Sequence, residues 1–298
     1  MDTLKSKYGK LMAEAATFSI APEKIDESNI YQPANMKLRE YFNILLNENL
    51  LPESGLGNVE NFKDFYNQVK NGKTGLILME HYSNFDLPAI IYLLEKHGEQ
   101  WSTEFANQVI AVAGMKLNEA SPLVRCLTEA YSRVVIYPTR SLESAEKSAT
   151  SEEERIEEEK RARKINFASM RKMDELKKEG KIILVFPSGT RYRPGKPETK
   201  RGLKEIDSYL RLFDIVLPVT INGLCLEINP DSPNDMTSDI VKKDVLTFTA
   251  SKVLDCKSFR KQVLENLPKE EPDPKQKIID QVMQILEDQH NKVESARK

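Results

Sequence analysis

The sequence predicts an α/β fold, in which helices flank a mainly parallel mixed sheet that follows a small N-terminal helical domain. Two observations carry this prediction. From residue 75 onwards, short apolar runs alternate with stretches of helical periodicity, as in βαβ units whose parallel strands are buried on both faces. Before residue 70, apolar residues recur at helical spacing without a strand pattern. The 298 residues suffice for one large domain, or for a medium domain beside a small one.

The first segment, residues 1–70, is predicted to be a helical domain. Two stripes of apolar side chains lie at helical spacing, before and after the loop PESGLGN: Leu38, Tyr41, Phe42, Leu45 and Leu46, then Val59, Phe62, Tyr66 and Val69. The turn signal Asn71-Gly72 follows at once, and the first strand pattern begins just beyond it. We therefore place the domain boundary here, with a catalytic α/β domain over residues 71–298.

Six continuous apolar runs follow this boundary. The predicted strands are residues 75–79, 109–113, 133–137, 182–186, 215–221 and 245–250. Between the third and the fourth, the segment 141–164 contains almost no apolar residues and is predicted to be a solvated helix that continues into an amphipathic one. After the breaker EPDPKQ, Ile278, Val282 and Ile285 share one face of a last helix. We expect that helix to pack against the core.

A polar turn follows the first predicted strand, in the stretch GLILMEHYSNFDLPAIIYLLE. His81 lies where the strand ends and Asp86 where the next helix begins, so both are expected at the carboxyl edge of the sheet, where open α/β sheets bind ligands. A neutral imidazole can accept a proton from a hydroxyl near pH 7 when a carboxylate fixes its tautomer. The pair is therefore a candidate base with its orienting carboxylate. The alternative, that Asp86 only caps the helix before Pro88 and His81 is a polar loop residue, stays open.

A second polar loop follows the predicted strand 182–186, in the run IILVFPSGTRYR. Ser188 and Gly189 are expected to shape a turn. In an extended loop, the spacing of two between Arg191 and Arg193 puts both guanidinium groups on one side, where they can hold a phosphate through forked hydrogen bonds. Taken alone, the run is also typical of a solvated basic loop.

The two loops together resemble the glycerolipid acyltransferase family, whose members carry His, four residues and Asp, and later a block close to Phe-Pro-Glu-Gly-Thr-Arg. Here the blocks are HYSNFD and FPSGTR, in the family order. The stretches AGMKLNEASPLVRCLTEAYSRVVIYPTR (113–140) and IVLPVTI (215–221) match as well. Ser188 in place of the usual Glu, the second arginine at 193 and the lack of a membrane-spanning run look more like the soluble, plastid-type glycerol-3-phosphate acyltransferases than the membrane-embedded lysophosphatidate enzymes.

This resemblance implies transfer of a fatty acyl group from a thioester, on acyl carrier protein or coenzyme A, to the sn-1 hydroxyl of glycerol 3-phosphate. The product is lysophosphatidate, and the reaction is the first step of phospholipid synthesis. The resemblance implies phosphate binding by Arg191 and Arg193, with Arg140 where the plastid type has the Lys of a Lys-His pair. Ser141 follows Arg140 and cannot replace the imidazole of that pair.

Two other functions share these features. A lysophosphatidate or other lysophospholipid acyltransferase would use the same His and Asp and the same phosphate-binding arginines. A catalytically silent protein would bind phosphate or phospholipid through the same loop. Release of free thiol that depends on an acceptor separates the enzymes from the silent protein, and exchange of the acceptor separates the two enzymes.

Composition excludes several other classes. A net charge of −2 with 30% charged residues carries no nucleic-acid signature. Cys126, Cys225 and Cys256 are far apart in the sequence, so we expect neither disulfides nor a zinc site. Because Gly-x-Gly-x-x-Gly and P-loop patterns are absent, no cofactor is expected. Without a span of ~20 apolar residues or a secretory signal, we expect a cytoplasmic protein, or a stromal one in a plant, with at most peripheral membrane contact.

Overall fold

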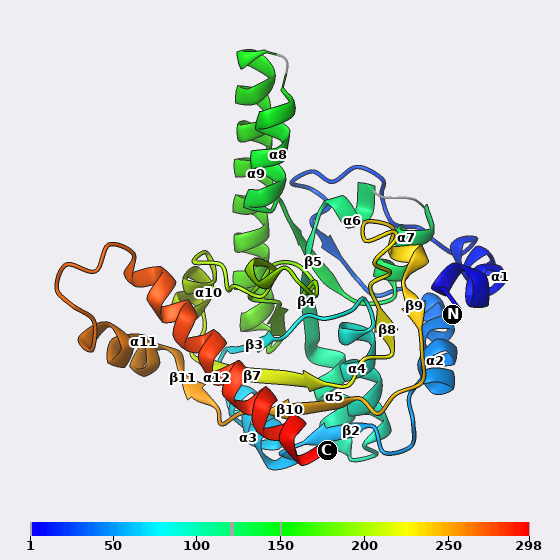
Figure 1. Cartoon of the computed structure of the whole chain (residues 1–298). Helices are drawn as coiled ribbons and strands as arrows, with labels where there is room; N and C mark the ends of the chain where they lie inside the picture. Colours follow the sequence, from blue (N-terminus) through cyan, green and yellow to red (C-terminus); the bar gives the residue numbers. More distant parts are fainter. Residues whose placement is uncertain (1, 120–121, 150, 298) are drawn as a thin grey trace.

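The computed structural model describes residues 2–119, 122–149 and 151–297 (Figure 1). Its strands are β1 (Tyr31–Gln32), β2 (Gly55–Gly57), β3 (Gly75–Met79), β4 (Val109–Gly114), β5 (Arg133–Ile136), β6 (Ile182–Val185), β7 (Ile215–Asn222), β8 (Leu226–Glu227), β9 (Ile240–Val241), β10 (Thr247–Ala250) and β11 (Leu254–Asp255). Its α-helices are α1 (Leu4–Ala16), α2 (Met36–Asn49), α3 (Val59–Lys70), α4 (Asp86–Lys96), α5 (Gln100–Gln108), α6 (Lys116–Glu119), α7 (Pro122–Glu129), α8 (Thr139–Ser148), α9 (Glu152–Lys178), α10 (Ile206–Leu212), α11 (Cys256–Glu265) and α12 (Pro274–Arg297). The α/β fold with its N-terminal helical region is thereby confirmed. Residues 120 and 121 of the third matching stretch, and residue 150 of the charged segment, lie outside the described residues.

A mostly parallel sheet forms the centre of the molecule. Within the described ranges it has nine strands, in the order β1-β5-β4-β6-β3-β7-β10-β2, with β11 paired to β7. The strands β3 to β7 are parallel to one another, and β10 runs antiparallel to β7. Because β3 lies between β6 and β7, the carboxyl ends of these three strands meet at one edge. The loops that follow β3 and β6 are therefore neighbours, although about a hundred residues separate them in sequence.

The sheet separates two hydrophobic clusters, since successive side chains of a strand point to opposite faces. On β3, Ile77 and Met79 pack with the cluster that includes α1 to α5. Leu76 and Leu78 face the other cluster, which includes α9 to α12. All five residues of β3 are buried, and so is the whole of β7. Burial on both faces explains why these strands are continuous apolar runs rather than alternating ones.

The expectation that residues 1–70 contain no strand is wrong in two places. β1 pairs antiparallel with β5, and β2 pairs parallel with β10, so this segment supplies both end strands of the order above. Each is only two or three residues long, and β2 is the sequence Gly-Leu-Gly. Such short pieces carry no periodic signal, because they become strands only through hydrogen bonds to a partner that is distant in sequence. The division of the chain at residue 70 stays a prediction.

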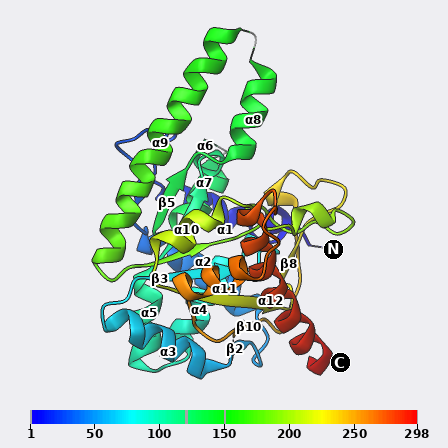
Figure 2. The ribbon, with the colours of Figure 1, turned by 90° about the vertical axis from the view of Figure 1, so that its left-hand side faces the viewer.

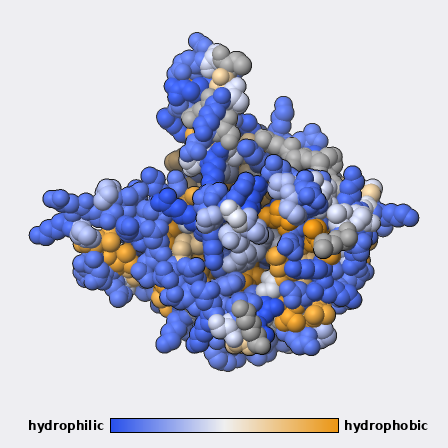
Figure 3. All heavy atoms as spheres, viewed as in Figure 1, coloured by the Kyte–Doolittle hydropathy of each residue, from blue (hydrophilic) through white to orange (hydrophobic). Residues whose placement is uncertain are grey.

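The charged segment 141–164 forms parts of two helices rather than one. Ser151 caps α9, accepting a hydrogen bond from the Glu154 backbone amide at 3.2 Å. Both views show α8 and α9 side by side, projecting from the body of the molecule (Figures 1 and 2). The projection is mostly hydrophilic in the view of Figure 3, as its charge predicted. Farther along α9, Ile165, Met173 and Leu176 are buried in the second cluster. No helix in the described part of the chain is long and apolar enough to cross a membrane.

Candidate active site

The turn after β3 holds His81 against Asp86. The Nδ1 atom of His81 lies 2.9 Å from the Asp86 Oδ2 atom, and α4 begins at Asp86 itself. Phe85, not Asp86, occupies the N-cap position, and no side-chain cap bond forms there. Asp86 is therefore not the N-cap of α4, and the role of the His81–Asp86 pair as base and orienting carboxylate stays a prediction. With Nδ1 directed at the carboxylate, Nε2 is the ring nitrogen left to accept a proton from a substrate.

Further hydrogen bonds hold the Asp86 carboxylate in place. Its Oδ2 atom accepts the backbone amides of Tyr82 and Ser83 at 2.6 and 2.9 Å, and its Oδ1 atom accepts the Ser83 hydroxyl at 3.0 Å. The side chain is 1% exposed. These hydrogen bonds hold the buried carboxylate in one orientation. The same Oδ2 atom faces Nδ1 of His81, so the carboxylate orients the imidazole.

The loop after β6 lies directly on this turn. The imidazole of His81 stacks on the ring of Phe186, with centroids 3.9 Å apart and planes inclined by 16°. The Tyr192 backbone amide donates to the His81 carbonyl at 2.8 Å. Between them, Gly189 has a φ of +64°, which favours glycine, and its amide closes a turn onto the Phe186 carbonyl at 2.9 Å. Ser188 is buried, and its hydroxyl donates to the Thr190 carbonyl at 2.7 Å. Ser188 and Gly189 therefore lie in a turn, as the sequence predicted.

The two predicted phosphate-binding arginines differ in environment. Arg191 is 8% exposed, and its Nη1 atom donates to the Oδ2 atom of the fully buried Asp239. Burial raises the pKa of the Asp239 carboxyl, although the neighbouring guanidinium opposes this shift. Arg193 is half-buried, and its Nη1 atom lies 3.3 Å from the Asn234 Oδ1 atom. One ion pair leaves Arg191 further N–H groups, because a guanidinium has five.

Arg140 follows β5, which lies farther from β3 in the sheet than β6, the strand that precedes Arg191 and Arg193. It is exposed in the first turn of α8, directly after β5. Since β4 and β6 separate β5 from β3, three steps of ~4.8 Å, or roughly 14 Å, lie between the strand that precedes Arg140 and the strand that precedes His81. The following Ser141 is buried. The role of Arg140 as a phosphate ligand stays a prediction.

The sequence did not indicate a second polar cluster beside the turn, made by Glu80, Tyr82 and His290. Glu80 is buried, and its Oε2 atom accepts from the Ile221 backbone amide and from His290 Nδ1, both at 2.9 Å. The Tyr82 hydroxyl donates to Glu80 Oε1 at 2.9 Å. A charged residue at the end of an apolar strand was a signal for Glu80. Nothing local marked His290, which is 210 residues away on α12.

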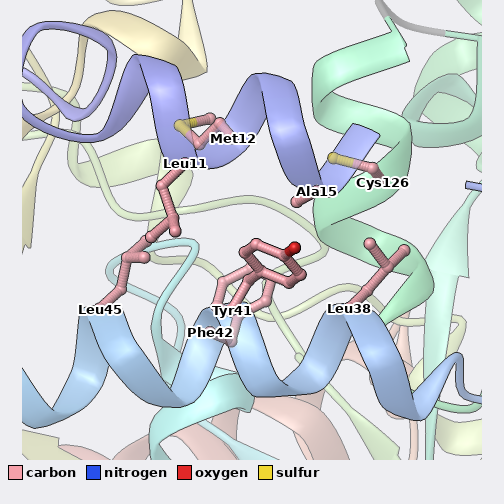
Figure 4. Close-up of a pocket in the computed structure, with 8 residues that line it drawn as sticks. All are labelled: Leu11, Met12, Ala15, Leu38, Tyr41, Phe42, Leu45 and Cys126. Atoms are coloured by element: carbon pink, nitrogen blue, oxygen red, sulfur yellow. The ribbon is translucent and has the colours of Figure 1, made fainter. Parts of the chain in front are cut away.

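An apolar cavity of about 10 Å³ lies between α1, α2 and α7 (Figure 4). Leu11 and Met12 line it from α1, and Leu38 and Phe42 from α2. A volume of roughly 10–15 Å³ on this measure holds about one water molecule. The cavity is thus a packing gap, too small for a fatty acyl chain.

Comparison with known proteins identifies the family of the chain. A family model described as Acyltransferase matches residues 58–222, which is more than half of the 298 residues and spans both loops of the site. A search of curated proteins found no significant match. The matched region begins just before α3 and ends with β7, so it covers the strands whose carboxyl ends carry His81 and the arginine loop. The chain therefore belongs to the acyltransferase family, and its general chemistry is the transfer of an acyl group.

Proposed function

We propose that this protein transfers a fatty acyl group from an acyl thioester to the sn-1 hydroxyl of glycerol 3-phosphate. One observation carries the proposal: the loop with Arg191 and Arg193 is bonded to the catalytic turn through the Tyr192 amide and the His81 carbonyl. This bond keeps a phosphate-binding loop at a fixed place beside the base. An acceptor held by its phosphate can then present a hydroxyl to His81.

The chemistry needs no covalent enzyme intermediate, because a thioester is already activated. His81 Nε2 takes the proton of the acceptor hydroxyl while the oxygen attacks the thioester carbonyl carbon. The new C–O bond forms, the C–S bond breaks, and the thiolate leaves. The imidazolium, stabilised by Asp86, returns the proton to sulfur, so the products are an ester and a free thiol. The sequence also lacks a Gly-x-Ser-x-Gly elbow, which agrees with direct attack.

The choice of acceptor is the first test. In detergent-free solution with acyl coenzyme A, we expect the purified protein to acylate glycerol 3-phosphate and to acylate little lysophosphatidate. The reason is that glycerol 3-phosphate is small and water-soluble, so a polar loop with two arginines beside His81 is enough to bind it. Acceptor-dependent release of free thiol measures the rate, and thin-layer chromatography identifies the product.

Reactions without acceptor control for simple thioester hydrolysis. A preference for lysophosphatidate would assign the second enzyme function and contradict the proposal. Equal thiol release with and without either acceptor would indicate a protein that binds phosphate without transferring acyl groups to it.

A second test concerns the donor. Four basic residues follow the phosphate loop: Lys196, Lys200, Arg201 and Lys204. Lys200 and Lys204 lie 3.9 and 3.6 Å from Glu287 and Asp273, whereas Lys196 and Arg201 are exposed. An acyl carrier protein is acidic, so an exposed basic patch near the thioester entrance would steer it. We expect Lys196→Glu/Arg201→Glu to raise KM for the carrier-protein donor several-fold more than KM for acyl coenzyme A, and added salt to reduce the difference.

The matched control reverses two exposed lysines at the opposite edge of the sheet. Lys73 precedes β3 and Lys257 lies in the first turn of α11, so Lys73→Glu/Lys257→Glu makes the same charge change away from His81. This variant should leave both donor KM values unchanged. If both pairs of substitutions raise the carrier-protein KM equally, the patch does not recognise the carrier.

A further inference from the structure

The residues on either side of His81 are held by the last helix of the chain. Glu80 and Tyr82 bond to each other, and the Nδ1 atom of His290 lies 2.9 Å from Glu80 Oε2 and 3.4 Å from the Tyr82 hydroxyl. Burial and the adjacent Glu80 carboxylate raise the pKa of Tyr82, so its hydroxyl stays protonated and donates. His81 itself bonds to Asp86 and stacks on Phe186. The catalytic turn is thus held on one side by α12 and on the other by α4 and the β6 loop.

The helix that carries His290 is fixed to the sheet at the same place. Next to His290, the Gln289 side chain donates to the Thr249 carbonyl at 2.6 Å and to the Thr220 hydroxyl at 3.2 Å. The Asn222 side-chain amide donates to the His290 carbonyl at 3.2 Å. Figure 1 shows α12 lying over β7, whose residue Ile221 donates its amide to Glu80. The turn of α12 around Gln289 and His290 is therefore bonded both to the sheet and to Glu80, the residue before the proposed base.

We propose that His290 is a positioning residue of the active site: through Glu80 and Tyr82, it holds the backbone of His81 at the distance that proton transfer to Nε2 requires. This inference rests on His81 as the proposed base. What His290 supplies is an N–H donor at Nδ1 toward a buried carboxylate, not contact with substrate. Without that donor, the buried Glu80 carboxyl loses one of its hydrogen-bond partners, and the turn relaxes. A displacement of about 1 Å at a reacting group can cost up to ~10²-fold in rate.

The experiment compares three variants of α12. His290→Ala is expected to lower kcat between about tenfold and about a hundredfold while KM for acceptor and donor stays within roughly twofold. His290→Asn should restore most of the rate, because its side-chain amide can place an N–H near the position of Nδ1. Gln289→Ala removes bonds from the same helix turn to β7 and β10 but none to Glu80, so it controls for loss of helix docking. It should lower the melting temperature as much as His290→Ala, with kcat close to that of the parent.

A second readout does not depend on the substrate assignment. The chain has three histidines, so the imidazole nitrogen signals in a ¹⁵N NMR spectrum can be assigned by single substitutions. In His290→Ala, the His81 signals should shift or broaden, whereas in His290→Asn and Gln289→Ala they should match the parent. Unchanged His81 signals in His290→Ala, or equal kcat in His290→Ala and Gln289→Ala, would overturn the inference. If the His81 signals shift in His290→Ala but the parent shows no acyl transfer, the positioning role of His290 is supported and the proposed function is contradicted.

Discussion

Replacing His81 by alanine is expected to lower kcat for acyl transfer by at least about a hundredfold, the usual loss when a general base is removed. The reason is geometric. With Nδ1 of His81 2.9 Å from Asp86, the Nε2 atom of the imidazole takes the acceptor proton in the proposed mechanism. The protein should stay folded, because the substitution removes one ring from a stack on Phe186 and one bond to Asp86, while two backbone amides still bond to that carboxylate. Steady-state kinetics measure kcat, and circular dichroism measures whether the variant is folded.

The matched control is His97→Ala. His97 caps the other end of α4, about 16 Å along an eleven-residue helix, and lies 3.4 Å from Glu99. Its loss should leave kcat within twofold of the parent. Binding of the acceptor, measured by calorimetry, should persist in His81→Ala because the arginine loop is intact. Near-parental turnover in His81→Ala would exclude His81 as the base.

The second large effect is expected for Arg191→Ala. If Arg191 holds the acceptor phosphate, this substitution should raise KM for glycerol 3-phosphate at least about tenfold and change KM for the acyl donor little. It should also destabilise the fold, because it leaves the buried Asp239 carboxylate without its partner. Loss of one member of a buried ion pair lowers the free energy of unfolding by about 3–5 kcal/mol. The loss is smaller if Asp239 takes up a proton. Kinetics and chemical denaturation measure the two effects separately.

A double variant separates phosphate binding from folding. Arg191→Ala/Asp239→Ala removes both charges, so it should recover much of the stability lost in the single variant. KM for glycerol 3-phosphate should nevertheless stay high, because the proposed phosphate ligand is still missing. Arg193→Ala, whose partner is Asn234, should raise the same KM without a comparable loss of stability. Recovery of KM in the double variant would show that Arg191 only supports the fold.

The sequence predicted the central strands well because the signal for a buried parallel strand lies within the strand itself. The runs 75–79 and 182–186 became β3 and β6 to within one residue, and the apolar face of the last helix with Ile278 and Val282 is buried. The edge strands β1 and β2 were missed because their signal does not lie within the strand itself. β1 and β2 are too short to have a period, and their conformation comes from pairing with β5 and β10.

The same distinction applies to the candidate site. His81 and Asp86 are five residues apart across a strand-to-helix turn, so sequence spacing alone could place them together. The ion pair of Arg191 with Asp239 joins residues 48 positions apart, and this pair, not the spacing of the two arginines, decides how Arg191 is oriented.

What the sequence by itself determined is therefore local: the buried strands, the turn that carries the His and Asp, and the loop that carries two arginines. The tertiary structure alone decided that β3 lies between β6 and β7, which brings those loops together, and that α12 returns to the turn with His290. The physical reason is that hydrophobic periodicity and turn chemistry act over a few residues. A contact between residues 80 and 290 depends on where the whole chain folds back, and no pattern near either residue encodes it.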